Sequence, residues 1–234
     1  MIFRHLPNAL TLANLLCGCA GLVAVADENL PWAGYLIWAA AAFDFADGLA
    51  ARALKAYSPI GGDLDSLADM VSFGALPGFI MYEMIHENVM SDWGLLAFVG
   101  FSLAVFSALR LATFNVDTRQ KDQFIGLPVP ASALLISSLP LGNLPAFQSF
   151  VQEPLVLILI VAMLSYLMVA PLPLLAFKFK STAWRGNEVK YVFLIAALLL
   201  FIFLKVVAIP IIILAYLGLS VATHARTTRQ TDRP

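Results

Sequence analysis

Repeated stretches of about twenty apolar residues limit what this chain can fold into. A helix needs about 20 mostly apolar residues to cross a bilayer. The chain offers eight such stretches: 8–26, 32–54, 64–86, 93–116, 129–147, 153–176, 189–205 and 206–223. Hydrophobic residues make up 61% of the 234 positions and charged residues 12%, against roughly 45–50% and about 25% in soluble domains. We therefore expect an all-α, polytopic membrane helix bundle, with about eight transmembrane helices in one integral membrane domain over residues 1–234.

The basic residues predict the orientation of this bundle. Lys and Arg in short loops favour the cytoplasmic side of a membrane. If the N-terminus is cytoplasmic, every Lys and Arg except Lys205 falls on that side of an eight-helix arrangement. We expect a multi-pass protein of the cell membrane with both termini cytoplasmic. A second interpretation makes 8–26 a signal peptide, because Arg4 precedes an apolar run and Ala24-Val25-Ala26 resembles a cleavage site.

Four acidic residues lie inside predicted spans, where ionisable groups are costly and usually mark function. Asp44 and Asp47 lie near the end of the second stretch, and Asp65 and Asp69 near the start of the third. Spacings of three and four residues place each pair on one helix face, and both pairs lie at similar depth. Four carboxylates in a low dielectric repel one another, so we expect two divalent cations to neutralise them. Oxygen ligands without nearby His or Cys suit Mg or Mn, although spacing alone also allows Ca.

Small residues flank these acids. Gly48 follows Asp44 by one turn and Ala51 follows Asp47 by one turn, which leaves a groove without side chains. Arg52 lies on the same side, and its planar guanidinium suits phosphate oxygens. Cations, groove and arginine together predict a diphosphate site on the cytoplasmic side. Two alternatives stay open, since paired acids also occur in ion-coupled transporters and small residues occur wherever membrane helices pack closely.

The same residues resemble a known family. The pattern Asp44-x2-Asp47-Gly48-x2-Ala51-Arg52-x8-Gly61-x3-Asp65-x3-Asp69 is similar, at every fixed position and gap, to the signature of the CDP-alcohol phosphatidyltransferases. The resemblance, which extends from residue 7 to about 135, implies a six-helix catalytic core that is often dimeric, so we expect a homodimer. It also implies that the aspartates hold two divalent cations, Mg or Mn, on the diphosphate of a CDP-linked lipid, and that Asp69 is the general base.

Three segments bear on the acceptor alcohol. Residues 65–77, 109–116 and 124–131 resemble the branch of the family that uses serine. This implies transfer of the phosphatidyl group from CDP-diacylglycerol to L-serine with release of CMP. Candidate contacts to serine or to a phosphate are Arg110, Ser72 and Asn115, although Arg110 also fits a positive-inside anchor. Thr113 departs from the branch, which commonly has a basic residue there, so glycerol phosphate, inositol phosphate and choline stay open as acceptors.

Polar residues on one side of the first stretch complete the candidate site. Asn8, Thr11 and Asn14 recur at a spacing of three. The resemblance implies that they lie near the nucleotide of CDP-diacylglycerol, together with Asp47, Gly48, Ala51, Arg52 and Gly61. Helix capping and interhelical hydrogen bonds are the other interpretation of these three side chains. We expect membrane lipid but no nucleic acid as a partner, and the sequence contains no GxGxxG, P-loop or HExxH pattern.

Overall fold

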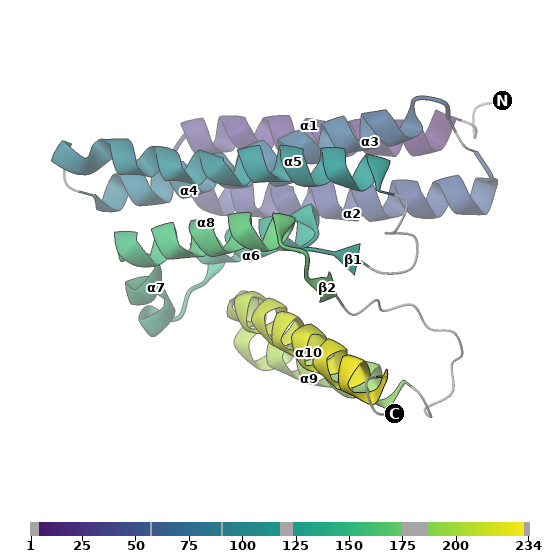
Figure 1. Ribbon diagram of the computed structural model, residues 1–234. Coiled ribbons are helices and arrows are strands. Elements are labelled where there is room, and N and C mark those ends of the chain that lie inside the picture. The colour runs from purple at the N-terminus through teal and green to yellow at the C-terminus, as the bar shows by residue number, and fades with distance from the viewer. Residues whose placement is uncertain (1–4, 57, 90, 118–123, 175–186, 232–234) are drawn as a thin grey trace.

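A computed structural model describes residues 5–56, 58–89, 91–117, 124–174 and 187–231. Helices account for nearly all of this part of the chain (Figure 1): α1 (Leu6–Ala26), α2 (Leu30–Leu54), α3 (Gly61–Asp69), η2 (Met70–Ala75), α4 (Leu76–Asn88), η3 (Ser91–Phe101), α5 (Ser102–Val116), α6 (Val129–Leu141), α7 (Pro145–Val151), α8 (Pro154–Val169), α9 (Glu188–Leu204), η5 (Lys205–Val207) and α10 (Ala208–Thr231). The strands β1 (Phe124–Ile125) and β2 (Pro173–Leu174) form one short antiparallel ribbon. The all-α prediction is confirmed.

Several of these helices can cross a bilayer. Four segments in the described part of the chain are long and apolar enough, namely Leu6–Ala26, Gly61–Asn88, Trp93–Val116 and Glu188–Val221. The bent pair α6 and α7 makes a fifth if it counts as one span. The chain is therefore a polytopic helical membrane protein. The larger number of eight spans stays a prediction.

Two predicted stretches end earlier than the apolar pattern indicated. The stretch 129–147 is not one straight helix, because α6 ends at Leu141 and α7 leaves at an angle of 116°. Pro145 begins α7, and a proline cannot continue the hydrogen-bond ladder of a preceding helix. The stretch 153–176 stops as α8 at Val169, just before Pro171 and Pro173. The basic residues predicted in the loops 118–123 and 175–186 lie outside the described residues.

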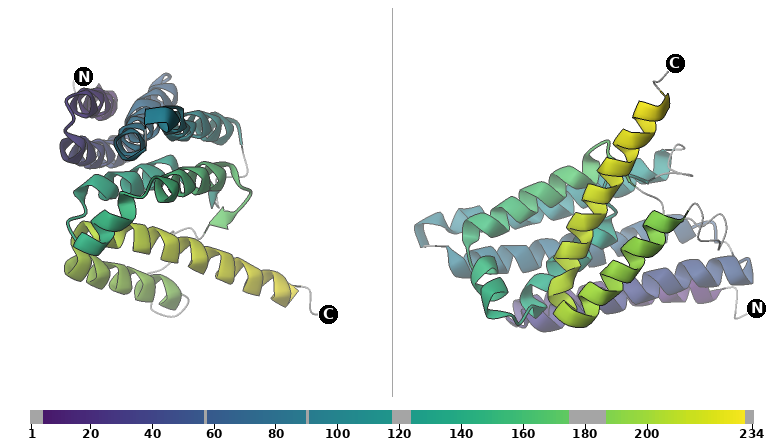
Figure 2. Two further views of the ribbon diagram at one scale, coloured as in Figure 1. Left: turned by 90° about the vertical axis from the view of Figure 1, so that its left-hand side faces the viewer. Right: turned by 90° about the horizontal axis from the view of Figure 1, so that it is seen from below.

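The N-terminal half forms the part of the bundle that holds the aspartates. α1 packs along α2, and the continuous helix of α3, η2 and α4 packs against α1. Figure 2, in its left view along the helices, shows α1 to α5 on one side, α6 and α8 beneath them, and α9 with α10 outermost. Buried apolar side chains fill the interior, among them Ile37, Phe73, Leu76, Met81 and Ile136. α9 contributes no buried residue of its own.

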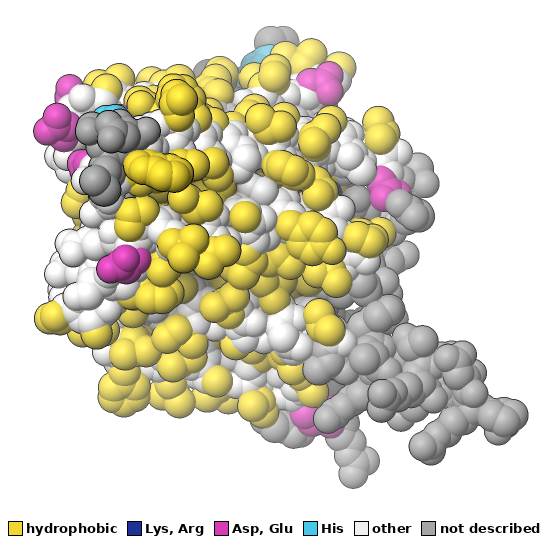
Figure 3. Space-filling model, turned by 60° about the vertical axis from the view of Figure 1, so that its left-hand side comes forward, with side chains coloured by type: hydrophobic (Ala, Val, Ile, Leu, Met, Phe, Trp, Pro, Cys, Tyr) yellow, Lys and Arg dark blue, Asp and Glu magenta, His cyan; other side chains and the backbone are white. Residues whose placement is uncertain are grey.

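The outer surface is apolar, as a lipid-facing surface must be. Leu95, Val116 and Phe203 are each about 80% exposed, at 83%, 79% and 80%. Hydrophobic side chains dominate the face seen in Figure 3. A soluble protein would rarely expose so large a continuous apolar surface, so this surface agrees with the spans identified above.

Candidate active site

Three of the four predicted acids converge where α2 and α3 meet. α2 ends at Leu54, because the next residue, Lys55, takes a left-handed conformation (φ 49°) that stops the helix, and α3 starts at Gly61 after a short turn. One carboxylate oxygen from each of Asp44, Asp47 and Asp65 lies within 4.8 Å of the other two. The backbone turn therefore brings together residues that are up to 21 positions apart, as the sequence predicted.

This carboxylate group fits a hard cation. Asp47 is buried, and Asp44 and Asp65 are half-buried. The Oδ1 atom of Asp65 is buried and has no hydrogen-bond partner in the described part of the structure. A buried carboxylate oxygen without a donor is costly, and a divalent cation bound by oxygen ligands would satisfy it. The three aspartates can therefore hold a metal ion.

Asp69 lies outside this close group and faces α1. It is 7% exposed, and its Oδ1 accepts a hydrogen bond from Asn14 Nδ2 at 3.1 Å. Asp47 also has a partner on α1, because the Thr11 hydroxyl donates to Asp47 Oδ2 at 2.5 Å. α1 thus orients one carboxylate from each pair.

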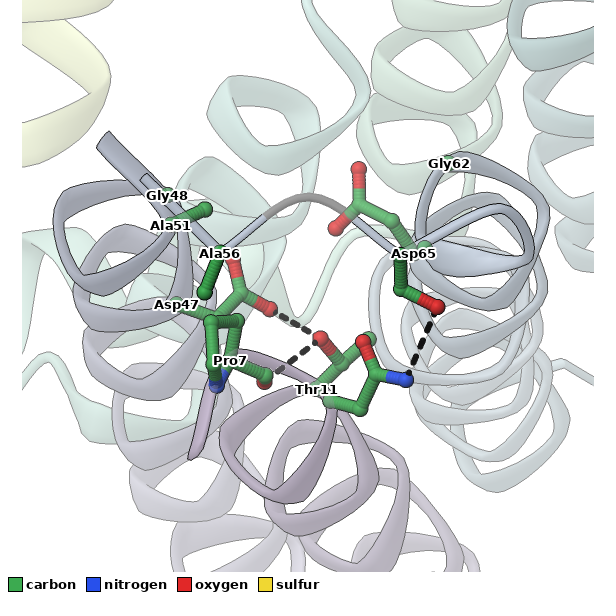
Figure 4. Close-up of a pocket in the computed structure, with 11 residues that line it drawn as sticks. Pro7, Thr11, Asp47, Gly48, Ala51, Ala56, Gly62 and Asp65 are labelled. Carbon is green, nitrogen blue, oxygen red and sulfur yellow. Dashed lines mark hydrogen bonds between the residues drawn. The ribbon is translucent and has the colours of Figure 1, made fainter. Parts of the chain in front are cut away.

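A pocket of about 210 Å³ opens beside Asp47 and Asp65. Figure 4 shows these two carboxylates directed toward the space between α2 and α3, with Thr11 below them. The residues that line this pocket come from α1, α2, the turn and α3: Pro7, Asn8, Thr11, Asp47, Gly48, Ala51, Ala56, Ser58, Gly61, Gly62 and Asp65. Most of the residues predicted to bind the CDP-linked lipid therefore line one pocket.

Arg52 does not line this pocket, but its guanidinium lies next to Gly48, which does. A Cβ placed on Gly48 would come within 3.4 Å of Arg52 Nη1, so the guanidinium lies over the bare backbone of Gly48. Asn8 Nδ2 donates to Ser58 Oγ at 3.3 Å and ties the start of α1 to the turn. Asn14, in contrast, does not line the pocket and is fully buried.

The three candidate serine contacts are dispersed. Ser72 is fully buried and donates to the backbone carbonyl of Asn14 at 2.9 Å. Asn115 is exposed and donates to Ser66 Oγ at 2.9 Å. Arg110 is 5% exposed and lines a second pocket, of about 160 Å³.

The second pocket also contains an acid that the sequence interpretation missed. Its lining residues come from α5, β1 and the end of α8: Arg110, Thr113, Asp117, Ile125, Met168, Val169, Ala170 and Pro171. Arg110, Thr113 and Asp117 follow one another at spacings of three and four, which places them on one helix face. That spacing was the available signal for Asp117.

Comparison with known proteins identifies the class of this site. Residues 4–162, more than half of the chain, match the family model for CDP-alcohol phosphatidyltransferase. The chain belongs to this family. It is also 32% identical over 175 residues to a CDP-diacylglycerol–serine O-phosphatidyltransferase of Bacillus subtilis, an alignment that covers 75% of this chain and 92% of that protein.

Two further relatives carry the same name. The Helicobacter pylori (strain J99) enzyme is 34% identical over 133 residues, which cover 56% of this chain and 54% of that protein. The Mycobacterium tuberculosis (strain H37Rv) enzyme is 39% identical over 139 residues, which cover 55% of this chain and 46% of that protein. The alignments thus span about half the length of these two relatives.

Proposed function

We propose that this protein is a CDP-diacylglycerol–serine O-phosphatidyltransferase, which transfers the phosphatidyl group from CDP-diacylglycerol to the hydroxyl of L-serine and releases CMP. One observation supports this above the others: one carboxylate oxygen from each of Asp44, Asp47 and Asp65 lies within 4.8 Å of the other two, beside a pocket lined by the signature residues Gly48, Ala51 and Gly61. The similarity to the Bacillus subtilis enzyme over 92% of its length supports serine as the acceptor.

The four aspartates are proposed to hold two divalent cations, Mg or Mn. Asp44, Asp47 and Asp65 supply the close oxygen group, and Asp69 supplies a further carboxylate one turn deeper than Asp65. Such cations, when bound, neutralise the diphosphate and the departing CMP. Thr11 holds Asp47 in place through its hydroxyl, and outer partners of this kind affect metal affinity about 10- to 100-fold.

The pocket beside Asp47 is proposed to bind the CDP part of the lipid. Gly48, Ala51 and Gly61 line the pocket and leave room for the diphosphate, and Arg52, whose guanidinium lies next to Gly48, is proposed to pair with the diphosphate oxygens. Asn8 and Thr11 line the same pocket from α1. The sequence pattern also predicted Asn14 beside the nucleotide, but Asn14 is fully buried and does not line this pocket.

Asp69 is proposed as the general base. It needs only to accept the proton of the serine hydroxyl as that oxygen bonds to phosphorus. Its carboxylate is on the face of α3 that also carries Asp65, since the two residues are four apart. A base in this position lies next to the cation group and faces the interior of the bundle.

Arg110 and Asp117 are proposed to hold the serine. α5 runs antiparallel to α3 and η2, because Asn115 bonds Ser66 and the Ser107 Cβ lies 3.0 Å from a Cβ built on Gly74. By this register Arg110 lies level with Val71, which is about 3 Å from Asp69 along the helix axis. The pocket presents a guanidinium and a carboxylate, which suit the carboxylate and ammonium of a free amino acid. Its volume of about 160 Å³ is below the ~300 Å³ of pockets for larger ligands.

The membrane arrangement is proposed as eight spans with a six-helix core and with both termini and the active site cytoplasmic. Acids gather at the end of the bundle opposite the aspartates, in the α1–α2 loop, at the end of α4 and before α8. Of the described residues, no Lys or Arg is visible on the face that Figure 3 turns toward the viewer. The lack of Lys and Arg on this face supports the orientation, because Lys and Arg mark the cytoplasmic side of a membrane protein. A homodimer is also proposed, from the family resemblance, and the mass of the purified protein in detergent tests it.

The deciding experiment measures CMP release from CDP-diacylglycerol by purified protein in detergent, with Mg or Mn, with and without serine. We expect release that needs serine and metal and that falls about 100- to 10,000-fold in the Asp69→Asn variant, the usual contribution of a general base. Release that occurs only with glycerol phosphate, inositol phosphate or choline would keep the family and change the acceptor. Metal-independent release, or an active Asp69→Asn variant, would contradict the assigned chemistry.

A further inference from the structure

The side chain of Asn14 donates a hydrogen bond to the proposed base, Asp69. Its Nδ2 donates to Asp69 Oδ1 at 3.1 Å, and both side chains are buried, at 0% and 7% exposure. The residues are 55 positions apart, so only the packing of α1 against α3 brings them together. A buried amide donor restricts the orientation of the carboxylate that accepts from it, because the hydrogen bond prefers a narrow range of distances and angles.

The backbone beneath Asn14 is fixed independently. Ser72, which is fully buried on η2, donates its hydroxyl to the Asn14 carbonyl oxygen at 2.9 Å. Gly18, one turn further along α1, lets the two helices touch, because a Cβ there would lie 2.9 Å from Ser72 Cα. η2 is a π-helical turn that starts directly after Asp69, and such turns are frequent at functional sites. α1 and η2 are therefore locked together at the level of Asp69.

The amide of Asn14 is poorly explained by packing alone. Its Oδ1 atom is buried and has no hydrogen-bond partner in the described part of the chain. An unpaired buried acceptor destabilises a fold, and an apolar side chain would avoid that loss. A leucine of similar shape would avoid this loss, but it could not donate a hydrogen bond to Asp69 as Asn14 does.

From these contacts we propose that Asn14 is a positioning residue for the reaction, which holds the Asp69 carboxylate in the orientation that accepts the proton of the acceptor hydroxyl. The inference rests on the proposed function, because it assumes that Asp69 is the base. It differs from the sequence interpretation, which placed Asn14 against the nucleotide. A nucleotide contact would affect binding of CDP-diacylglycerol, whereas a positioning role affects turnover.

The test compares Asn14→Leu with the wild type in the CMP-release assay. Leucine keeps the branched outline of asparagine and removes the donor. We expect kcat to fall about 10- to 100-fold, the usual effect of misplacing a catalytic group, while the KM values for CDP-diacylglycerol and serine change less than twofold. Asn14→Ala provides a second variant if leucine prevents folding. Asn88→Ala is the matched control, because Asn88 also donates from Nδ2 but to Met84 O at the far end of α4, and it should behave as the wild type.

A double variant makes the assignment specific. If Asn14 acts through Asp69, then Asn14→Leu combined with Asp69→Asn should be no slower than Asp69→Asn alone. Three results would each overturn the proposal. The first is a double variant whose loss of kcat equals the product of the two single losses. The others are Asn14→Leu with a raised KM for CDP-diacylglycerol, or with a loss of folded protein, at unchanged kcat. The assay uses whichever alcohol supports CMP release, so a failure of serine as acceptor is seen in the wild type and leaves this comparison intact. If no alcohol supports release, Asp69 has no proton to accept and the inference falls.

Discussion

Arg110 and Asp117, which carry opposite charges, both line the second pocket, where they are proposed to bind serine. Arg110→Gln and Asp117→Asn should each raise the KM for serine about tenfold, which corresponds to a loss of roughly 1.4 kcal/mol of binding. The KM for CDP-diacylglycerol should stay unchanged, because neither residue lines the pocket beside Asp47. Steady-state CMP release at varied serine and fixed lipid measures both values.

An acceptor without an ammonium group distinguishes the role of Asp117 from that of Arg110. Asp117→Asn should raise the KM for serine but not the KM for 3-hydroxypropionate, which has the hydroxyl and the carboxylate of serine but no ammonium group. Asp63→Asn is the matched control, since this exposed acid in the first turn of α3 lines neither pocket. Equal losses for both acceptors would contradict an ammonium contact by Asp117.

At the scale of elements, the close approach of α1 and η2 depends on the absence of a side chain at Gly18. Gly18→Ala should destabilise the protein by about 1–3 kcal/mol, because the added methyl group would meet Ser72 Oγ and backbone atoms that cannot move away. Gly218→Ala on α10 meets nothing within 4 Å and should be neutral, or stabilising by about 0.5–1 kcal/mol. Thermal unfolding of the two variants in detergent gives the comparison, and equal melting temperatures would contradict it.

Elements near the second pocket were not visible in the sequence. Gly126 has a φ of 79°, and its N–H donates to Leu172 O at 2.8 Å, so that β1 pairs with β2 across the end of α8. A two-residue ribbon leaves no periodic pattern, and its partners are 48 to 50 positions apart. The bend between α6 and α7 is similar, since Pro145 is readable but the 116° angle depends on what each helix packs against.

At the scale of the whole molecule, the orientation predicts opposite labelling of two engineered cysteines. Asp27 and Asp63 are both exposed, the first after α1 and the second in α3. In a background with Cys17 and Cys19 replaced by alanine, Asp27→Cys should react with a membrane-impermeant maleimide on intact cells. Asp63→Cys should react only after permeabilisation. The reverse pattern would place the aspartate site on the outer side and contradict the charge distribution.

The class of fold, the family and the pairing of the aspartates follow from the order of residues alone. Apolar stretches of about 20 residues allow little but membrane helices, and helical periodicity places Asp44 with Asp47, and Asp65 with Asp69, on one helix face. These are local properties, because a helix makes its hydrogen bonds within one segment. They could therefore be predicted before any packing was known.

Which side chains face one another across different helices depends on the packing of the whole fold. It paired Asn14 with Asp69 and Thr11 with Asp47, and it gathered Arg110 and Asp117 into a pocket closed by the end of α8. The two hydrogen bonds join residues 36 and 55 positions apart, and the pocket depends on how one helix is rotated against another. That rotation is set by small residues such as Gly18 and by buried hydrogen bonds, neither of which the pattern of apolar residues along one helix contains.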